Sequence, residues 1–190
     1  MTIAVLLGRV LPADAATAAQ KCSATEAKSA GKSAQKQLAC VAKATGAGVG
    51  VDAPCSAAAA AKLTAAFAKA EAAGGCLVSG EVGQVAGLIG GLMQTATEVV
   101  ASGIAADRRK CAASKLGIAG KAAYGWLNCH AKALGRGLAT DVACLDAVQA
   151  KLDAALAAAE HRLVCMTQGD APAMQQAVAA ATADILDVIL

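Results

Sequence analysis

The eight cysteines are the residues of this chain whose type and spacing most clearly predict chemistry. They form two sets of four with the same intervals of 18, 15 and 21 residues, and the second set lies 89 residues after the first. Cysteine thiols either oxidise to disulfides or bind metal ions. Structural zinc sites usually contain short Cys-x-x-Cys pairs, and this sequence has none. We therefore predict four disulfides, no metal site, and an oxidising compartment.

The repeated spacing extends beyond the cysteines. Residues 21–80 align with residues 110–169 without a gap, and this predicts a tandem duplication. No candidate catalytic group repeats with the cysteines, so the duplicated unit is expected to be a scaffold. Besides the cysteines, the matched identical residues include Gly31/Gly120, Gly46/Gly135, Asp52/Asp141, Leu63/Leu152 and Glu71/Glu160.

The elements that must position the cysteines are predicted to be helices. Phe, Tyr and Trp each occur once, and an alanine-rich chain with so few aromatic residues favours helices over strands. Apolar residues recur at helical spacing in three segments of each repeat, within 27–41, 59–70 and 85–100 and again within 116–134, 148–159 and 174–189. We predict an all-α fold built from two three-helix units, each a helical hairpin followed by a third helix.

Helical geometry restricts the cysteine pairing. Cys22 and Cys40 lie on one predicted helix, ~27 Å apart at ~1.5 Å per residue, whereas a disulfide requires Cα atoms within ~7 Å. Cys55 and Cys76 are ~31 Å apart by the same arithmetic. An antiparallel hairpin would instead place one pair beside the turn and the other at the open end. The predicted disulfides are Cys22–Cys76, Cys40–Cys55, Cys111–Cys165 and Cys129–Cys144.

The chain is predicted to be exported. Residues 1–15 contain an apolar run followed by Ala13-Asp14-Ala15, a small-x-small cleavage pattern typical of signal peptides. The usual preceding basic segment is missing, as in a truncated signal. We predict a signal at 1–15, a first repeat at 16–105, a second repeat at 106–190, and a periplasmic or extracellular location.

The uncharged stretch from Val82 to Thr97 has two interpretations. Gly83, Gly87 and Gly91 lie at four-residue spacing, which is typical of closely approaching helices. The stretch is shorter than the ~20 residues that span a bilayer. We therefore expect a core helix and no transmembrane span.

Five lysines fall on one side of the first predicted helix: Lys21, Lys28, Lys32, Lys36 and Lys43. The simpler interpretation is a solvated face opposite the alanine core. The functional interpretation is a docking stripe for an anionic polymer or lipid headgroup. Nucleic acid is not expected as a partner, because no aromatic side chains alternate with the lysines to stack on bases.

A second candidate surface lies on the corresponding helix of the second repeat: Tyr124, Trp126, His130 and Arg136. Tyr124 and Trp126 replace glutamines of the first repeat, and aromatic and Arg side chains are common binding anchors. In the alternative interpretation, the two aromatic residues cover the junction between the repeats. His130 lies on the apolar stripe, where a partly buried, hydrogen-bonded histidine is the expected arrangement.

The segments that carry a family resemblance are Gly120-Lys121-Ala122-Ala123, Cys129-His130-Ala131-Lys132-Ala133 and Asp141-x-x-Cys144, with their counterparts in the first repeat. The pattern resembles a group of exported bacterial Ala/Lys-rich proteins with tandem four-cysteine helical repeats and no established activity. The resemblance covers most of the chain after residue 15 and implies no catalytic residues.

These observations predict an exported, non-enzymatic, disulfide-stabilised helical scaffold that acts as a binding or structural module. The alternative is a carrier that holds an apolar small molecule or lipid between its helical hairpins. No cofactor is expected. The candidate partners are another exported protein, an anionic polymer or an apolar ligand.

Overall fold

The computed structural model describes residues 16–100 and 104–190, so the predicted signal at 1–15 lies outside the described residues. Within those ranges all regular secondary structure is α-helix, which confirms the all-α prediction. The helices are α1 (Ala18–Ala47), α2 (Ala53–Ala72), α3 (Val82–Val99), α4 (Arg109–Leu134), α5 (Val142–Arg162) and α6 (Ala171–Ile189).

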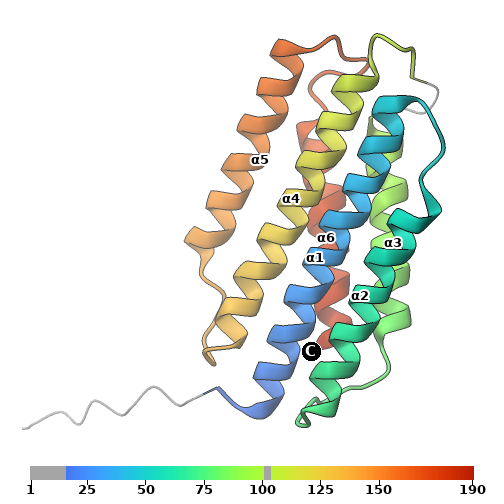
Figure 1. Cartoon of the computed structure of the whole chain (residues 1–190). Coiled ribbons are helices and arrows are strands. Elements are labelled where there is room, and N and C mark those ends of the chain that lie inside the picture. The colour runs from blue at the N-terminus through green and yellow to red at the C-terminus, as the bar shows by residue number, and fades with distance from the viewer. Residues whose placement is uncertain (1–15, 101–103) are drawn as a thin grey trace, which may run out of the picture.

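The six helices form one bundle with a shared core (Figure 1). The central helices α1 and α4 lie side by side and antiparallel, with α2 beside α1 and α5 beside α4. The third helices of the two halves, α3 and α6, pack against each other behind this layer. The two predicted three-helix units therefore share one core and are not separate bodies.

Each helical hairpin is joined by two disulfides, and the four pairs are those expected from helical geometry. Cys40–Cys55 and Cys129–Cys144 lie near the hairpin turns, with Cα–Cα distances of 6.0 and 5.9 Å. Cys22–Cys76 and Cys111–Cys165 lie at the open ends, each with a Cα–Cα distance of 5.3 Å. No described cysteine is free.

The hairpin turns use the residues that the sequence favours, with one exception. Gly48 and Gly137 follow α1 and α4 with φ of 71° and 68°, a left-handed conformation that favours glycine. Asp141 caps α5 by accepting a hydrogen bond from the Ala143 N–H at 3.0 Å. Asp52 makes no such bond to α2, because the corresponding position is Pro54, which has no N–H.

The interface between α1 and α4 depends on two glycines at matched positions. A Cβ at Gly31 would lie 3.1 Å from Leu127 Cβ, and a Cβ at Gly120 would lie 3.1 Å from Leu38 Cβ. Gly120 and Leu127 are the residues of the second half that match Gly31 and Leu38, 89 positions later. The same glycine–leucine contact is therefore made in both directions across the interface. The two halves thus approach each other closely at their centre.

This interface predicts a substitution effect. Gly31→Leu should destabilise the protein by about 1–3 kcal/mol, because the new side chain would force α1 away from Leu127 and the backbone of Tyr124. Gly117→Leu in α4 is the control, since nothing lies within 4 Å of a Cβ at that position. Urea unfolding of both variants tests this. Equal stabilities would show that the glycine does not determine the approach of the helices.

The glycines of α3 do not have the predicted role. A Cβ at Gly83, Gly87 or Gly91 would meet nothing within 4 Å. Gly87 and Gly91 instead line a shallow groove of about 280 Å³ between α3 and α6. The core contacts of α3 come from its apolar side chains Val85, Ile89, Leu92 and Ala96. None of the described helices combines the length and apolar character needed to cross a membrane.

Candidate functional site

The predicted lysine stripe is exposed along α1, and part of it borders a groove. All five lysines from Lys21 to Lys43 are exposed, as expected for a solvated face. Lys32 and Lys36 also line a groove of about 540 Å³ between α1 and α2, together with Lys62 of α2. The structure therefore brings two stripe lysines together with a third that the sequence did not single out.

The floor of the α1–α2 groove is apolar and its edge is basic. Ala59, Leu63 and Ala66 contribute the apolar lining from α2, and Tyr124 reaches the groove from α4. Ser33 is also among the lining residues, and its buried hydroxyl oxygen has no hydrogen-bond partner among the described residues. A volume of this size falls within the ~300–1,000 Å³ typical of small-molecule sites. The lining suits a ligand with an apolar body and an anionic head.

The second half has a matched but smaller groove between α4 and α5, of about 350 Å³. Ile118 and Ala122 stand where the first groove has Ser29 and Ser33, and two further substitutions change the space and the charge of the groove. Val148 replaces Ala59 and Gly125 replaces Lys36, and the Val148 methyl groups lie within 3.0 Å of a Cβ built at Gly125. Val148 therefore occupies space that is open in the first half, and one lysine is lost from the edge.

The four residues of the second candidate surface do not form one exposed patch. Trp126 is 8% exposed and belongs to the core, so it is not available as a surface anchor. Arg136 lies in the exposed turn after α4, and Tyr124 lies between α1 and the groove. The alternative interpretation, in which the two aromatic residues cover the junction between the repeats, agrees with Trp126 in the shared core and with Tyr124 against Gly31 of α1. Such burial is possible because α4 is covered on more than one side, by α1, α5 and α6. Only Tyr124 contributes to the candidate site.

His130 is partly buried and hydrogen-bonded, with its Nδ1 2.8 Å from Thr140 Oγ1. Burial lowers the pKa of this histidine, which favours the neutral imidazole. The arrangement holds the turn between α4 and α5 against α4, consistent with a structural histidine.

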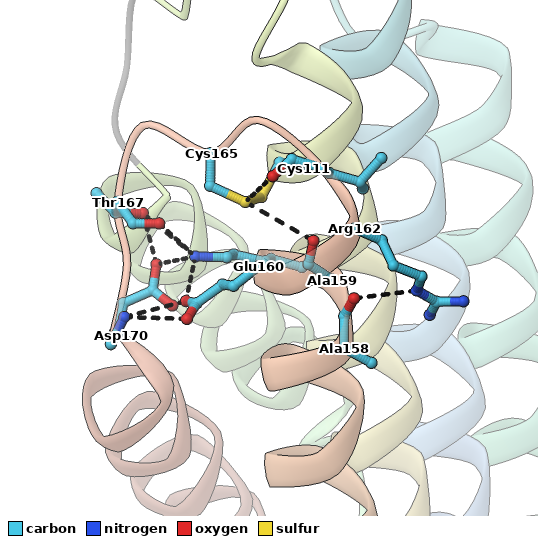
Figure 2. Close-up of a disulfide and its surroundings, with 11 residues drawn as sticks. Cys111, Ala158, Ala159, Glu160, Arg162, Cys165, Thr167 and Asp170 are labelled. Atoms are coloured by element: carbon cyan, nitrogen blue, oxygen red, sulfur yellow. Dashed lines mark hydrogen bonds and ion pairs between the residues drawn. A yellow bond between two sulfur atoms is a disulfide. The ribbon is translucent and has the colours of Figure 1, made fainter.

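A second polar site, which the sequence analysis missed, lies beside the Cys111–Cys165 disulfide (Figure 2). The Lys115 side chain is 1% exposed, and its Nζ donates to Glu160 Oε1 at 2.7 Å, Asp170 Oδ2 at 2.7 Å and the Thr167 carbonyl at 2.8 Å. All three ammonium protons therefore have acceptors. Burial alone would raise the pKa of Glu160, but the hydrogen bonds from Lys115 and Gly169 and the Lys115 charge hold it below its ordinary value.

One sequence signal could have identified this site. Lys115 is the first charged residue after Cys111 and stands 89 residues after Glu26, while Glu160 matches Glu71 exactly. The change from Glu26 to Lys115 reverses a charge, while the acid at the matched position, Glu71 or Glu160, is kept. This comparison indicates that the two halves differ in charge at this position.

No family model, curated protein or solved structure matches this chain. Over residues 16–100 and 104–190, the protein is a disulfide-linked bundle of six helices with an open, basic-edged apolar groove in its first half.

Proposed function

We propose that this protein is an exported, non-enzymatic binding module whose ligand site is the α1–α2 groove. The observation that carries the proposal is the combination of three lysines with an apolar floor in a groove of about 540 Å³. Four disulfides support export to the periplasm or the extracellular space, because such bonds persist in oxidising compartments.

The chemistry of the lining favours an anionic amphipath such as a fatty acid. The acyl chain would lie on Ala59, Leu63 and Ala66, and the carboxylate would lie among the lysine ammonium groups at the edge. The proposed ligand site differs from the sequence-based alternative of a carrier site between the hairpins, because the α1–α4 interface between the hairpins is closely packed at Gly31 and Gly120.

We expect the purified protein to bind laurate with one site per chain. Ala66→Leu should weaken this binding by about tenfold or more, because the larger side chain would fill the groove. Ala155→Leu, at the matched position of the second groove, is the control and should leave the affinity unchanged. Isothermal titration calorimetry measures both. Equal losses in the two variants, or no binding by the unmodified protein, would contradict the proposed site.

The lysines should contribute to laurate binding mainly through electrostatic attraction, which salt weakens. Replacing Lys32, Lys36 and Lys62 by Gln should weaken laurate binding more at low salt than at physiological salt, and should leave dodecanol binding unaffected. If dodecanol binding fell equally, the lysines would be acting through their apolar stems instead.

A further inference from the structure

The loop before the third helix is built in the same way in both halves. Glu71 Oε1 accepts the Gly80 N–H at 2.8 Å, and Glu160 accepts the Gly169 N–H at 3.1 Å. The next residue in each loop, Glu81 or Asp170, is acidic and caps its helix without a side-chain bond to the backbone. Each half therefore directs two carboxylates towards one position on its first helix.

The residue at that position differs between the halves. In the second half it is Lys115, whose ammonium group joins Glu160 and Asp170. In the first half it is Glu26, and oxygens of Glu26, Glu71 and Glu81 lie within 4.8 Å of one another. Three carboxylates thus converge where the second half has two carboxylates and a cation.

The first cluster has polar groups that the described residues do not satisfy. Glu26 and Glu81 are 2% and 7% exposed, and both Glu81 carboxylate oxygens are buried without a hydrogen-bond partner among the described residues. Glu26 Oε1 lies 3.4 Å from Cys22 Sγ and 3.8 Å from Cys76 Sγ. These contacts do not satisfy the carboxylate, because disulfide sulfurs carry no proton to donate. Buried carboxylates without a counter-charge are costly.

We propose that Glu26, Glu71 and Glu81 bind one hard divalent cation of the Ca²⁺ type, in the place that the Lys115 ammonium takes in the second half. The donor set is made of carboxylate oxygens, which Ca²⁺ prefers. Oxygens that bind one Ca²⁺ at ~2.4 Å lie within about twice that distance of one another, and the three glutamate oxygens meet this condition. The two cysteines of the site are joined in a disulfide, so soft thiolate-binding metals are disfavoured.

The charge balance supports a divalent ion. Lys115 with Glu160 and Asp170 carries a formal charge of one negative unit, and three ionised glutamates with a divalent cation carry the same charge. With a monovalent cation, the three glutamates would carry a formal charge of two negative units, one more than the Lys115 site. The cation would connect α1 to the end of α2 and the start of α3, as Lys115 connects α4 to α5 and α6.

The site should respond to pH in a defined direction. Burial, followed by the negative charges of Glu81 and Glu71, raises the pKa of Glu26 to about 7. Without a cation, the folded protein keeps this proton while the unfolded chain loses it, so stability falls as pH rises from the ordinary glutamate range to about 7. Protons and cations compete for the same oxygens, so Ca²⁺ binding should strengthen over the same interval.

The experiment uses chelator-treated, disulfide-intact protein and CaCl₂ at about pH 8, with calorimetry for affinity and stoichiometry and thermal unfolding for stability. The unmodified protein should bind one Ca²⁺ per chain and unfold at a higher temperature when Ca²⁺ is present. Glu26→Gln should weaken binding about tenfold or more, because it removes one of the three charges.

Glu26→Lys reproduces the second half and provides the sharpest test. This variant should lose the Ca²⁺ response and should be at least as stable without Ca²⁺ as the unmodified chelated protein. Glu98→Lys makes the same charge change at an exposed site on α3 and should leave Ca²⁺ binding unchanged. Absence of Ca²⁺ binding by the unmodified protein would overturn the proposal. Ca²⁺ binding by the Glu26→Gln variant with the same affinity as the unmodified protein would also overturn it. The Glu26→Gln variant therefore tests the site even if Glu26→Lys does not fold.

Discussion

Reducing the four disulfides should destabilise the protein more than any single substitution. In the loop-entropy model, the loops that span 54 residues contribute about 4 kcal/mol each and those that span 15 about 3 kcal/mol each, although nested loops are not additive. Much of the remaining core is alanine, which buries little apolar area per residue. We therefore expect the unfolding temperature to fall by about 20 °C or more.

Thermal unfolding followed by far-UV circular dichroism, with and without reductant, measures this change. Alkylation under denaturing, non-reducing conditions should label no cysteine, and peptide mapping should recover Cys22 with Cys76 and Cys40 with Cys55. An unchanged unfolding temperature after complete reduction would show that the helices are held by packing alone.

Lys115→Met should have the largest effect of any single substitution away from the cysteines. The change keeps the volume of the side chain but leaves Glu160 and Asp170 facing each other without a cation. Removing one partner of a buried ion pair typically costs about 3–5 kcal/mol, and the lower value applies because Glu160 is partly exposed. Urea unfolding at neutral pH measures the loss.

Lys121→Met is the matched control for this prediction, because Lys121 lies on the same helix but is exposed. Its effect should stay below about 1 kcal/mol. If both variants lost the same stability, the buried ammonium group of Lys115 would contribute no more than the exposed ammonium group of Lys121.

The two polar sites should give the halves opposite pH dependences. The pKa of Glu160 is lowered, so the Lys115 site contributes stability above the ordinary glutamate range and loses it as pH falls through the lowered pKa. The pKa of Glu26 is raised to about 7, so without a cation the first half loses stability as pH rises towards that value.

The helices could be predicted because apolar residues recur at helical spacing. The disulfides could be predicted because the lengths of the helices exclude bonds within one helix. The spacing of Ala27, Ala30, Ala34 and Leu38 marked the buried face of α1, and helix length alone restricted the cysteine pairing. The apolar residues predicted for the third helices, within 85–100 and 174–189, lie in α3 and its C-cap residue Val100 and in α6.

The sequence could not predict how the halves pack, and the errors follow from this. The sequence left Trp126 between a surface role and a place at the junction of the repeats, because a single helix shows one apolar stripe, whereas α4 contacts neighbours on several sides. The reciprocal contact of Gly31 and Gly120 also depends on the antiparallel placement of α1 and α4. The Glu26 and Lys115 sites each combine two helices with the loop before a third, so only the comparison of the two halves, and no local pattern, could indicate them.

Amide chemical shifts during a laurate titration test most directly whether the ligand binds in the α1–α2 groove and not in the smaller groove of the second half. We expect saturable shifts at Ser33, Lys36, Leu63 and Ala66, and little change at the matched positions Ala122, Gly125, Leu152 and Ala155. Equal shifts in the two grooves, or shifts confined to the exposed turns at the ends of the bundle, would contradict the proposal.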